Sequence, residues 1–188
     1  MIRFDINVPV SPEPTPLCEI MQRMGSDKGA ASAYAQHNYT RYYHPLFAPH
    51  RDEVRRVLEL GIFGGASLRG WREYFPNATI YGLDIDKETL FTEDRIVTAY
   101  CNSTSRSSVL EALDGLPLFD IIIDDGPHYF DAQYSFWEWS NVKCNGVYIC
   151  EDLDRNDGRW ERWMREGRLV DIPHVHNGTD NKLMVWTP

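Results

Sequence analysis

The feature that most constrains the fold is a regular alternation of short apolar runs and helical segments from residue 56 onward. The apolar runs are RVLELG, TIYGLDID, RIVTAYCN, FDIIIDD and GVYICED. Segments with helical spacing, such as SLRGWREYF, SRSSVLEAL and YFDAQYSFWEW, lie between them. Runs this short and apolar are typical of parallel strands whose two faces are covered. The pattern predicts an α/β fold, with a mostly parallel sheet and helices on both faces.

The two ends of the chain differ from this pattern. Near the C-terminus, GRWERWMREG predicts a helix, and LVDIPHVH and KLMVW predict an antiparallel strand pair. Before residue 56 the chain is polar and aromatic, and it opens with the proline-rich PVSPEPTP. Short helices are expected at Cys18–Met24 and Pro45–Arg55. We expect one domain over 1–188, with 1–55 as a lead-in and lid and 56–188 as the cofactor-binding and catalytic core.

Composition excludes several classes of protein. The net charge of -9 over 188 residues argues against a nucleic-acid binder, which needs a basic surface. The N-terminus lacks a signal-peptide core and no apolar run could span a membrane, so neither export nor a membrane partner is expected. The cysteines form no CxxC pair, which argues against a zinc knuckle and favours reduced thiols in a cytoplasmic protein. They are Cys18, Cys101, Cys144 and Cys150.

A glycine-rich turn follows the first apolar run. In LELGIFGGASLRGW, Gly61, Gly64 and Gly65 allow a tight turn and a close approach to a ligand, and Ser67 could cap the next helix. The spacing is G-x-x-G-G, so the dinucleotide fingerprint G-x-G-x-x-G is not met. The alternative reading is a plain turn between strand and helix.

Polar residues end the next two runs. Asp84 follows the glycine turn by about twenty residues, where a carboxylate can accept both ribose hydroxyls. Asp86 is a weaker candidate for this ribose-binding role. The alternative reading of Asp84 is a solvated acid at the end of a strand. Asn102 is placed to bond an adenine edge. An adenosine-containing cofactor without a pyrophosphate fits these features, which favours S-adenosylmethionine over NAD.

Four acids end the last two runs. Asp124 and Asp125 end one, and Glu151 and Asp152 end the other. If these strands are neighbours, their ends lie about 5 Å apart, and carboxylates that close need protons or a hard cation. Because strand side chains alternate, Asp125 is the expected ligand and Asp124 a supporting residue. The ligand set for Mg²⁺ is then Asp125, Glu151 and Asp152, unless these acids only bond helix ends and arginines.

Two basic residues complete the candidate site. His128 follows Asp125 by three residues and could take a proton from a hydroxyl, or it could only pack in the loop. Lys28, with Asp27 in the segment GSDKG, could fold over the cofactor or acceptor, or form a charged surface turn. The aromatic residues are expected mostly in the core, with one or two N-terminal tyrosines lining an acceptor pocket. They are Tyr39, Tyr42, Tyr43, Trp137 and Trp139.

These motifs together resemble a known family. VLELGIFGGASLRGWREYFPNATIYGLDID, FDIIIDDGPH and GVYICEDL are similar to class I S-adenosylmethionine-dependent methyltransferases, which have a Rossmann-like fold. With GSDKG and HNYTRYYHPLF, they resemble the metal-dependent sugar O-methyltransferases of the mycinamicin and macrocin type, which act in natural product biosynthesis.

The resemblance implies a role for each matching residue. Glu59, Gly61 and Gly65 match the first cofactor motif, Asp84 the ribose-binding acid, and His128 the general base. The acids Asp125, Glu151 and Asp152 match the magnesium ligands. The chain departs from the pattern of that family in three ways. It has Pro127 in place of serine and Cys101-Asn102-Ser103 in place of an acidic Gly-Asp-Gln, and it is a short chain without a separate N-terminal domain.

The sequence therefore predicts an O-methyltransferase that uses S-adenosylmethionine and Mg²⁺. The acceptor would be a hydroxyl of a sugar, or of another small molecule with vicinal hydroxyls, and a homo-oligomer is possible. A metal-independent methyltransferase and a non-catalytic S-adenosylmethionine-binding module stay open as alternatives. The catalytic residues would be His128 and Asp125. The cofactor side would comprise Glu59, Gly61, Gly64, Gly65, Ser67, Asp84, Asn102, Asp124 and Lys28.

Overall fold

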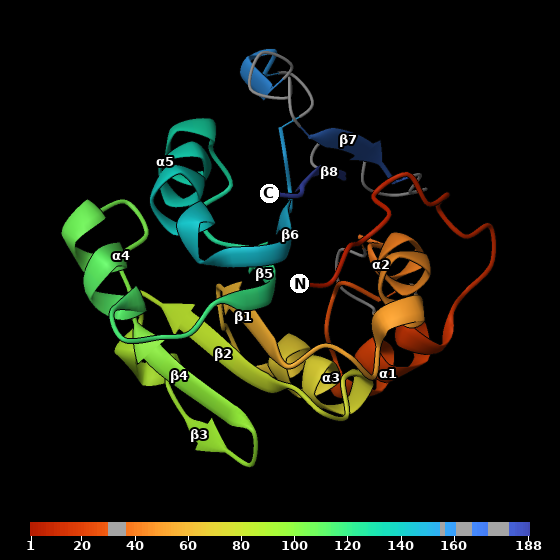
Figure 1. Ribbon diagram of the computed structural model, residues 1–188, viewed down its shortest axis with the longest axis horizontal. Helices are drawn as coiled ribbons and strands as arrows, with labels where there is room; N and C mark the ends of the chain where they lie inside the picture. Colours follow the sequence, from red (N-terminus) through yellow and green to blue (C-terminus); the bar gives the residue numbers. More distant parts are fainter. Residues whose placement is uncertain (30–36, 155–156, 161–166, 173–180) are drawn as a thin grey trace.

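An eight-stranded sheet with the strand order β3-β4-β2-β1-β5-β6-β8-β7 runs through the molecule (Figure 1). This computed structural model describes residues 1–29, 37–154, 157–160, 167–172 and 181–188. The strands are β1 Arg56–Leu60, β2 Thr79–Asp84, β3 Thr92–Glu93, β4 Ile96–Tyr100, β5 Phe119–Asp124, β6 Cys144–Cys150, β7 Arg168–Asp171 and β8 Lys182–Trp186. The α-helices are α1 Pro16–Met24, α2 Thr40–Phe47, α3 Ala66–Tyr74, α4 Arg106–Leu113 and α5 Phe130–Ser140.

The strand directions confirm the predicted fold class. The five central strands, β4-β2-β1-β5-β6, are parallel to one another. The C-terminal strands β8 and β7 add an antiparallel pair beside β6. Strand β3, only two residues long and antiparallel to β4, was not predicted. The chain leaves β1 towards β2 on one side and returns to β5 on the other. Such a switch point is where open parallel sheets bind ligands, at the carboxyl ends of the strands.

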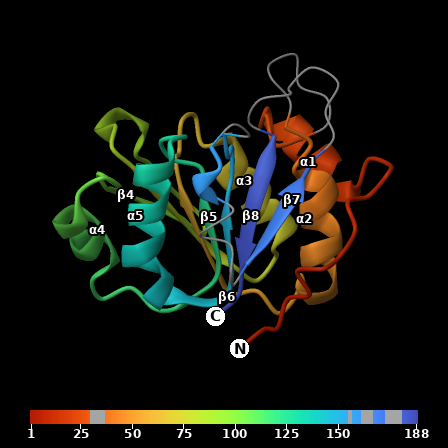
Figure 2. The same cartoon turned by 90° about the horizontal axis from the view of Figure 1, so that it is seen from above.

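Helices cover both faces of the sheet, as predicted. Helices α1, α2 and α3 lie on one face and α4 and α5 on the other (Figure 2). Alternation along β1 explains the two cores, because Val57 packs with the first set of helices and Leu58 with the second. In β5, Ile121 and Ile123 face the first core while Ile122 faces the second. Burial on both faces is why apolar residues predominate in β1 and β5.

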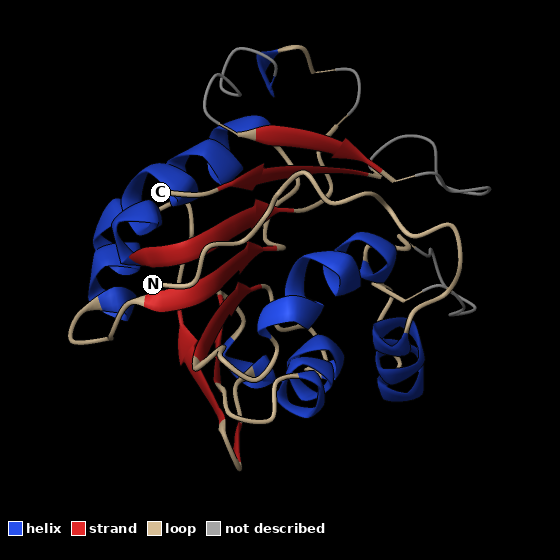
Figure 3. Ribbon diagram, turned by 45° about the vertical axis from the view of Figure 1, so that its right-hand side comes forward, coloured by secondary structure: helices blue, strands red, loops and turns tan. Residues whose placement is uncertain are grey.

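The N-terminal segment runs across the sheet as a loop rather than hanging free (Figure 3). The hydroxyl of Tyr42 and the guanidinium of Arg168 both donate to the carbonyl of Ile6. Phe4 is buried against Phe47, with ring centroids 5.9 Å apart. Residues from both ends of the chain therefore anchor this segment.

The second predicted helix was misplaced. It was expected at Pro45–Arg55, but α2 spans Thr40–Phe47 and a 3-10 turn follows at Ala48–His50. Proline inside a helix leaves a carbonyl without its donor four residues later. Here the orphaned carbonyl of Arg41 accepts the amide of Ser11 at 2.9 Å, so the N-terminal segment compensates for Pro45. This long-range bond is not readable from local sequence.

The helix predicted for GRWERWMREG falls mostly on 161–166, outside the described residues. Within the part of the chain that the structure describes, no helix has the length and apolar character needed to cross a membrane.

Candidate active site

The glycine turn after β1 lies directly against the end of β5. Gly61 has φ of +90°, and a Cβ atom there would lie 2.1 Å from the carbonyl oxygen of Asp125. Only glycine combines this left-handed backbone with so close an approach. The amide of Asp125 also donates to the carbonyl of Leu60 at 3.0 Å. The glycine turn and Asp125 are thus fixed relative to each other by backbone contacts.

The acids that end β5 and β6 meet at this edge. The strands are neighbours, with Asp124 opposite Cys150, and the amide of Glu151 donates to the carbonyl of Asp124 at 2.9 Å. At Asp152 the backbone turns into the left-handed region, with φ of 55°. Beyond the strand, side chains no longer alternate between faces. This turn explains how the buried Glu151 and Asp152 both belong to one acid cluster with the partly exposed Asp125.

Lys28 lies inside this cluster. Its Nζ atom is 2.5 Å from Oδ2 of Asp125, 2.5 Å from Oε2 of Glu151 and 3.8 Å from Oε1 of Glu59. The side chain is only 2% exposed. Burial by itself would lower the pKa of this ammonium, but Asp125 and Glu151 outweigh burial and raise it well above its usual value. Lys28 is therefore a buried cation.

His128 bridges the other side of the cluster. Its Nε2 atom is 3.3 Å from Oδ1 of Asp125 and 3.3 Å from Oδ2 of Asp152. The hydrogen bond to Asp125 is the main reason that the pKa of His128 is raised to about 9. Asp125, His128 and Asp152 each offer a ligand atom, and these atoms all lie within 4.8 Å of one another. The histidine side chain is 44% exposed, so it borders the open side of the site.

Three N-terminal side chains hold the far oxygens of the acids. Tyr43 donates its hydroxyl to Oε1 of Glu151 at 2.5 Å, and Tyr39 donates to Oδ1 of Asp152. Nδ1 of His37 lies 3.1 Å from the same Asp152 oxygen. Sequence reasoning missed His37. The sequence signal that could have indicated His37 is its position close to Tyr39 and Tyr43, because this places three polar rings near the start of α2.

Burial and the neighbouring charges shift the pKa values of the acids in the cluster. Burial, reinforced by Asp125, raises the pKa of Asp152 to about 6. Burial also raises the pKa of Glu151 well above its usual value, although Lys28 opposes the change. For Asp125, burial would act in the same direction, but Lys28 and His128 together lower its pKa. The pKa values of Glu151 and Asp152 thus stay raised despite the nearby basic groups, whereas that of Asp125 is lowered.

Asp84 binds the glycine turn. Its Oδ2 atom accepts the amides of Ile62 at 2.7 Å and Phe63 at 3.3 Å, and its Oδ1 atom accepts the amide of Asp86 at 2.9 Å. Phe63 is almost fully exposed. Asn102 sits at the end of β4, where its Oδ1 accepts the backbone amide and the hydroxyl of Thr104. Both predicted cofactor residues therefore lie at the carboxyl edge of the sheet.

Ser67 does not cap α3, so that prediction was wrong. Gly65, with φ of 73°, is the N-cap, and its side chain is absent, so no side-chain capping bond forms. Ser67 lies one residue inside the helix and donates its hydroxyl to Oε1 of Glu59 at 2.5 Å. Trp71 donates to the other Glu59 oxygen. Burial raises the pKa of Glu59 to about 7, although Lys28 opposes the shift. Gly64 borders open space.

Asp124 and Asp125 have different surroundings. Asp124 is fully buried and accepts the hydroxyl of Tyr148 at 3.1 Å and the amide of Gly126 at 3.2 Å. Burial raises its pKa to about 7. Asp125 instead faces Lys28 and His128. Two adjacent aspartates are thus divided between the second core and the acid cluster, as alternation along a strand requires.

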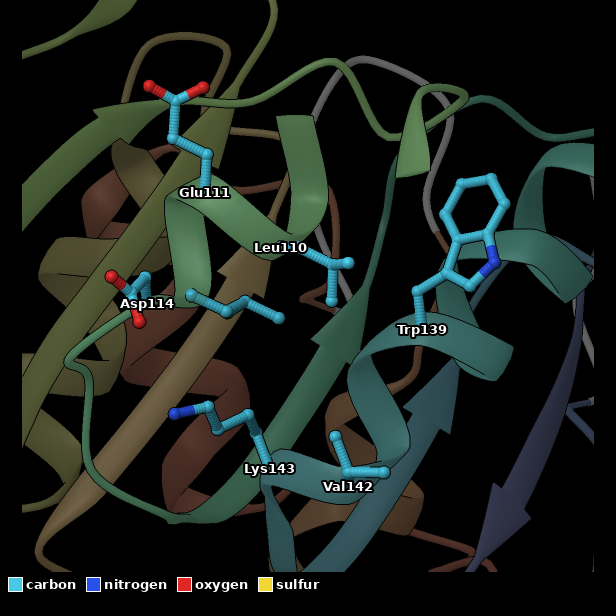
Figure 4. A pocket seen from close by; sticks show the side chains of 7 residues that line it. Leu110, Glu111, Asp114, Trp139, Val142 and Lys143 are labelled. Atoms are coloured by element: carbon cyan, nitrogen blue, oxygen red, sulfur yellow. The ribbon is translucent and has the colours of Figure 1, made fainter. Parts of the chain in front are cut away.

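A separate groove of about 430 Å³ lies between α4 and α5 (Figure 4). Its lining includes Leu113 and Asp114 at the end of α4 and Val142 and Lys143 just before β6. These residues precede the first residues of β5 and β6. The groove is therefore at the amino edge of the sheet, opposite the acid cluster.

Comparison with known proteins gives sequence relatives but no matching family model. A tetracenomycin-C rhamnosyl 2'-O-methyltransferase of Streptomyces olivaceus is 33% identical over 146 residues, covering 73% of this chain and 37% of that protein. Demethylmacrocin O-methyltransferase of Streptomyces fradiae is 36% identical over 126 residues, which cover 62% of this chain and 32% of that protein. Mycinamicin VI 2''-O-methyltransferase of Micromonospora griseorubida is 34% identical over 126 residues, with the same coverage. The chain spans about a third of the length of these relatives.

Solved structures similar to this chain are also methyltransferases. The MycE methyltransferase of the mycinamycin pathway, in complex with Mg, SAH and mycinamycin VI, has a TM-score of 0.64 at 28% identity, covering 74% of this chain and 40% of that one. The O-methyltransferase TomG of Streptomyces achromogenes, at 17% identity and a TM-score of 0.58, shares the fold and covers 89% of this chain and 88% of its own. By sequence and by fold, the chain belongs to the class I S-adenosylmethionine-dependent methyltransferases of the macrocin and mycinamicin sugar O-methyltransferase type.

Proposed function

We propose that this protein transfers a methyl group from S-adenosylmethionine to a hydroxyl oxygen of a sugar or another small molecule with vicinal hydroxyls. The observation that carries the proposal is the acid cluster at the carboxyl edge of β5 and β6, with His128 3.3 Å from both Asp125 and Asp152. A glycine turn and Asp84 lie at the same edge, where the chain switches direction. Relatives that methylate sugars of natural products support the choice of acceptor.

The donor set suits a hard divalent cation. Carboxylate oxygens are the ligands that Mg²⁺ prefers, and the cluster is rich in them. The structure of MycE was solved with Mg, which supports the same choice here. Asp125, Glu151 and Asp152 would hold the ion. When bound, it would act as a Lewis acid that lowers the pKa of a hydroxyl beside it.

The residues of this chain would then accept the hydroxyl proton and hold the reacting groups in position. In the transfer, the acceptor oxygen forms a bond to the methyl carbon as the carbon–sulfur bond of the sulfonium breaks. The hydroxyl proton passes to Nε2 of His128, and S-adenosylhomocysteine is the leaving product. Because the pKa of His128 is about 9 beside two carboxylates, the imidazole must first lose its proton to act as a base. A cation that neutralises Asp125 and Asp152 would favour that loss.

A second candidate is methyl transfer by the same fold without a metal. The observation in its favour is Lys28, whose ammonium already bridges Asp125 and Glu151. Activity measured with S-adenosylmethionine and a rhamnoside acceptor, after chelator treatment and then with Mg²⁺ restored, separates the two. We expect loss with chelator and recovery with Mg²⁺. Full activity in excess chelator would favour the metal-independent reaction. S-adenosylmethionine binding without turnover on any vicinal diol would indicate a non-catalytic binding module.

A further inference from the structure

The oxygens of the acid cluster that a cation would need are already engaged. Oδ2 of Asp125 and Oε2 of Glu151 each lie 2.5 Å from the ammonium of Lys28. Mg²⁺ binds oxygen at about 2.0–2.1 Å. An ammonium and a metal ion on the same two oxygens would be two cations within a few ångströms of each other, beside side chains of Lys28 and Glu151 that are only 2% and 1% exposed. Their repulsion is strong there because water screens charges at so buried a position much less than in bulk solvent.

The backbone of Lys28 is held on both sides, so its side chain is the part that can move. The carbonyl of Lys28 accepts the amide and the hydroxyl of Thr40, both at 3.2 Å. Its amide donates to the hydroxyl of Ser26 at 3.3 Å. Gly29 packs against α1, where an added Cβ would lie 3.2 Å from the amide nitrogen of Gln22. A lysine on such an anchored base can withdraw its ammonium by rotating its four-carbon stem.

We propose that Lys28 is an internal counter-ion that occupies the cation site and leaves Asp125 and Glu151 when a divalent cation binds. Lys28 is then a positioning residue rather than a cofactor ligand. It keeps the two acids close together without metal and sets the affinity of the site by competing for their oxygens. This inference rests on the proposed function, because it assumes that Asp125 and Glu151 are metal ligands.

The first test is calorimetric titration of Mg²⁺ into the wild-type protein, Lys28→Met and Lys28→Arg. Methionine keeps the apolar stem and removes the charge, so we expect binding at least about tenfold tighter. Arginine keeps the charge and serves as the matched control, with affinity near that of the wild type. If Lys28→Met binds with equal or weaker affinity than a wild-type protein that does bind, the competition is refuted while the metal site stands.

A second test uses the wild-type protein, since Lys28→Met leaves buried acids without a partner and could fail to fold. Acetylation by a soluble N-hydroxysuccinimide ester is followed by mass spectrometry with and without Mg²⁺. Lys28, which is buried, should react several times faster at saturating Mg²⁺, and the exposed Lys87 should be unchanged. Unchanged acetylation of Lys28 would overturn the inference. If calorimetry shows no cation binding to any form, the metal in the proposed function falls too, and turnover in chelator then shows whether methyl transfer survives.

Discussion

Nε2 of His128 lies 3.3 Å from Oδ1 of Asp125, while the other oxygen of that carboxylate faces Lys28. Asp125 thus stands between two basic groups of different exposure, the half-exposed imidazole and the buried ammonium. Its backbone carbonyl, on the other side, is in contact with the glycine turn at Gly61. Asp125 is therefore the residue through which His128, Lys28 and the glycine turn are connected.

Asp125→Ala should abolish turnover while leaving S-adenosylmethionine binding nearly intact. We expect a loss on the order of a thousandfold, because a catalytic metal supplies several kcal/mol of transition-state stabilisation. Methyl-transfer assays and calorimetry with S-adenosylhomocysteine measure the two effects. Asp131→Ala, which removes an exposed acid of α5, is the control. Equal loss of turnover and cofactor binding would mean that Asp125 serves the cofactor or the fold.

His128→Gln should lower the rate by roughly 10²–10⁴-fold, the usual contribution of a general base. Glutamine keeps a polar side chain but cannot accept a proton at neutral pH. Mg²⁺ binding should be retained or become tighter, because the variant lacks the positive charge of the protonated imidazole beside Asp125 and Asp152, and calorimetry checks this. A loss of cation binding as large as that of Asp125→Ala would instead identify His128 as a ligand, since its Nε2 belongs to the group of atoms able to hold an ion. His50→Gln is the control for loss of an imidazole.

In chelator, the protein should become less stable as pH rises from about 4 to 7. Glu59 and Asp124 have a pKa of about 7 and Asp152 about 6 in the folded state, against about 4 in an unfolded chain. The folded state therefore binds more protons in this window, so the free energy of unfolding falls with rising pH. Thermal melts at pH 5.5 and 7.5 should show the higher melting temperature at pH 5.5.

Asp124→Asn isolates one contribution to this pH dependence. The amide resembles a protonated carboxyl in shape and does not titrate, so the difference between the two melting temperatures should shrink. A pH dependence that is unchanged in Asp124→Asn would show that Asp124 does not take up a proton on folding.

Gly61→Ala should destabilise the protein by about 3 kcal/mol or more, because the backbone is left-handed and the new Cβ would collide with the Asp125 carbonyl. Gly64→Ala, three residues later, borders open space and should stay within about 0.5 kcal/mol of the wild type. Denaturant unfolding of both variants provides the comparison. Similar stabilities for the two would contradict the close contact between the turn and β5.

The sequence by itself determined the sheet and the edge at which its polar residues gather. Burial on both faces requires continuous apolar strands, and parallel strands bring their carboxyl ends to one edge. That is why the runs ending in Asp125 and Glu151 could be expected on neighbouring strands of such a sheet, and why Asp124 and Asp125 could be assigned to different faces. These inferences depend only on local periodicity and chain order.

Only the tertiary structure decided which groups neutralise the acids. Lys28 is 97 residues from Asp125 and 123 from Glu151, and Tyr43 is 108 residues from Glu151. The placement of α2 depends likewise on Ser11, which satisfies the carbonyl that Pro45 leaves unpaired. Which residues become the partners of the acids depends on how the N-terminal segment packs over the sheet. Local sequence sets each residue's chemistry, but long-range packing brings a particular lysine, histidine and tyrosine to a particular carboxylate.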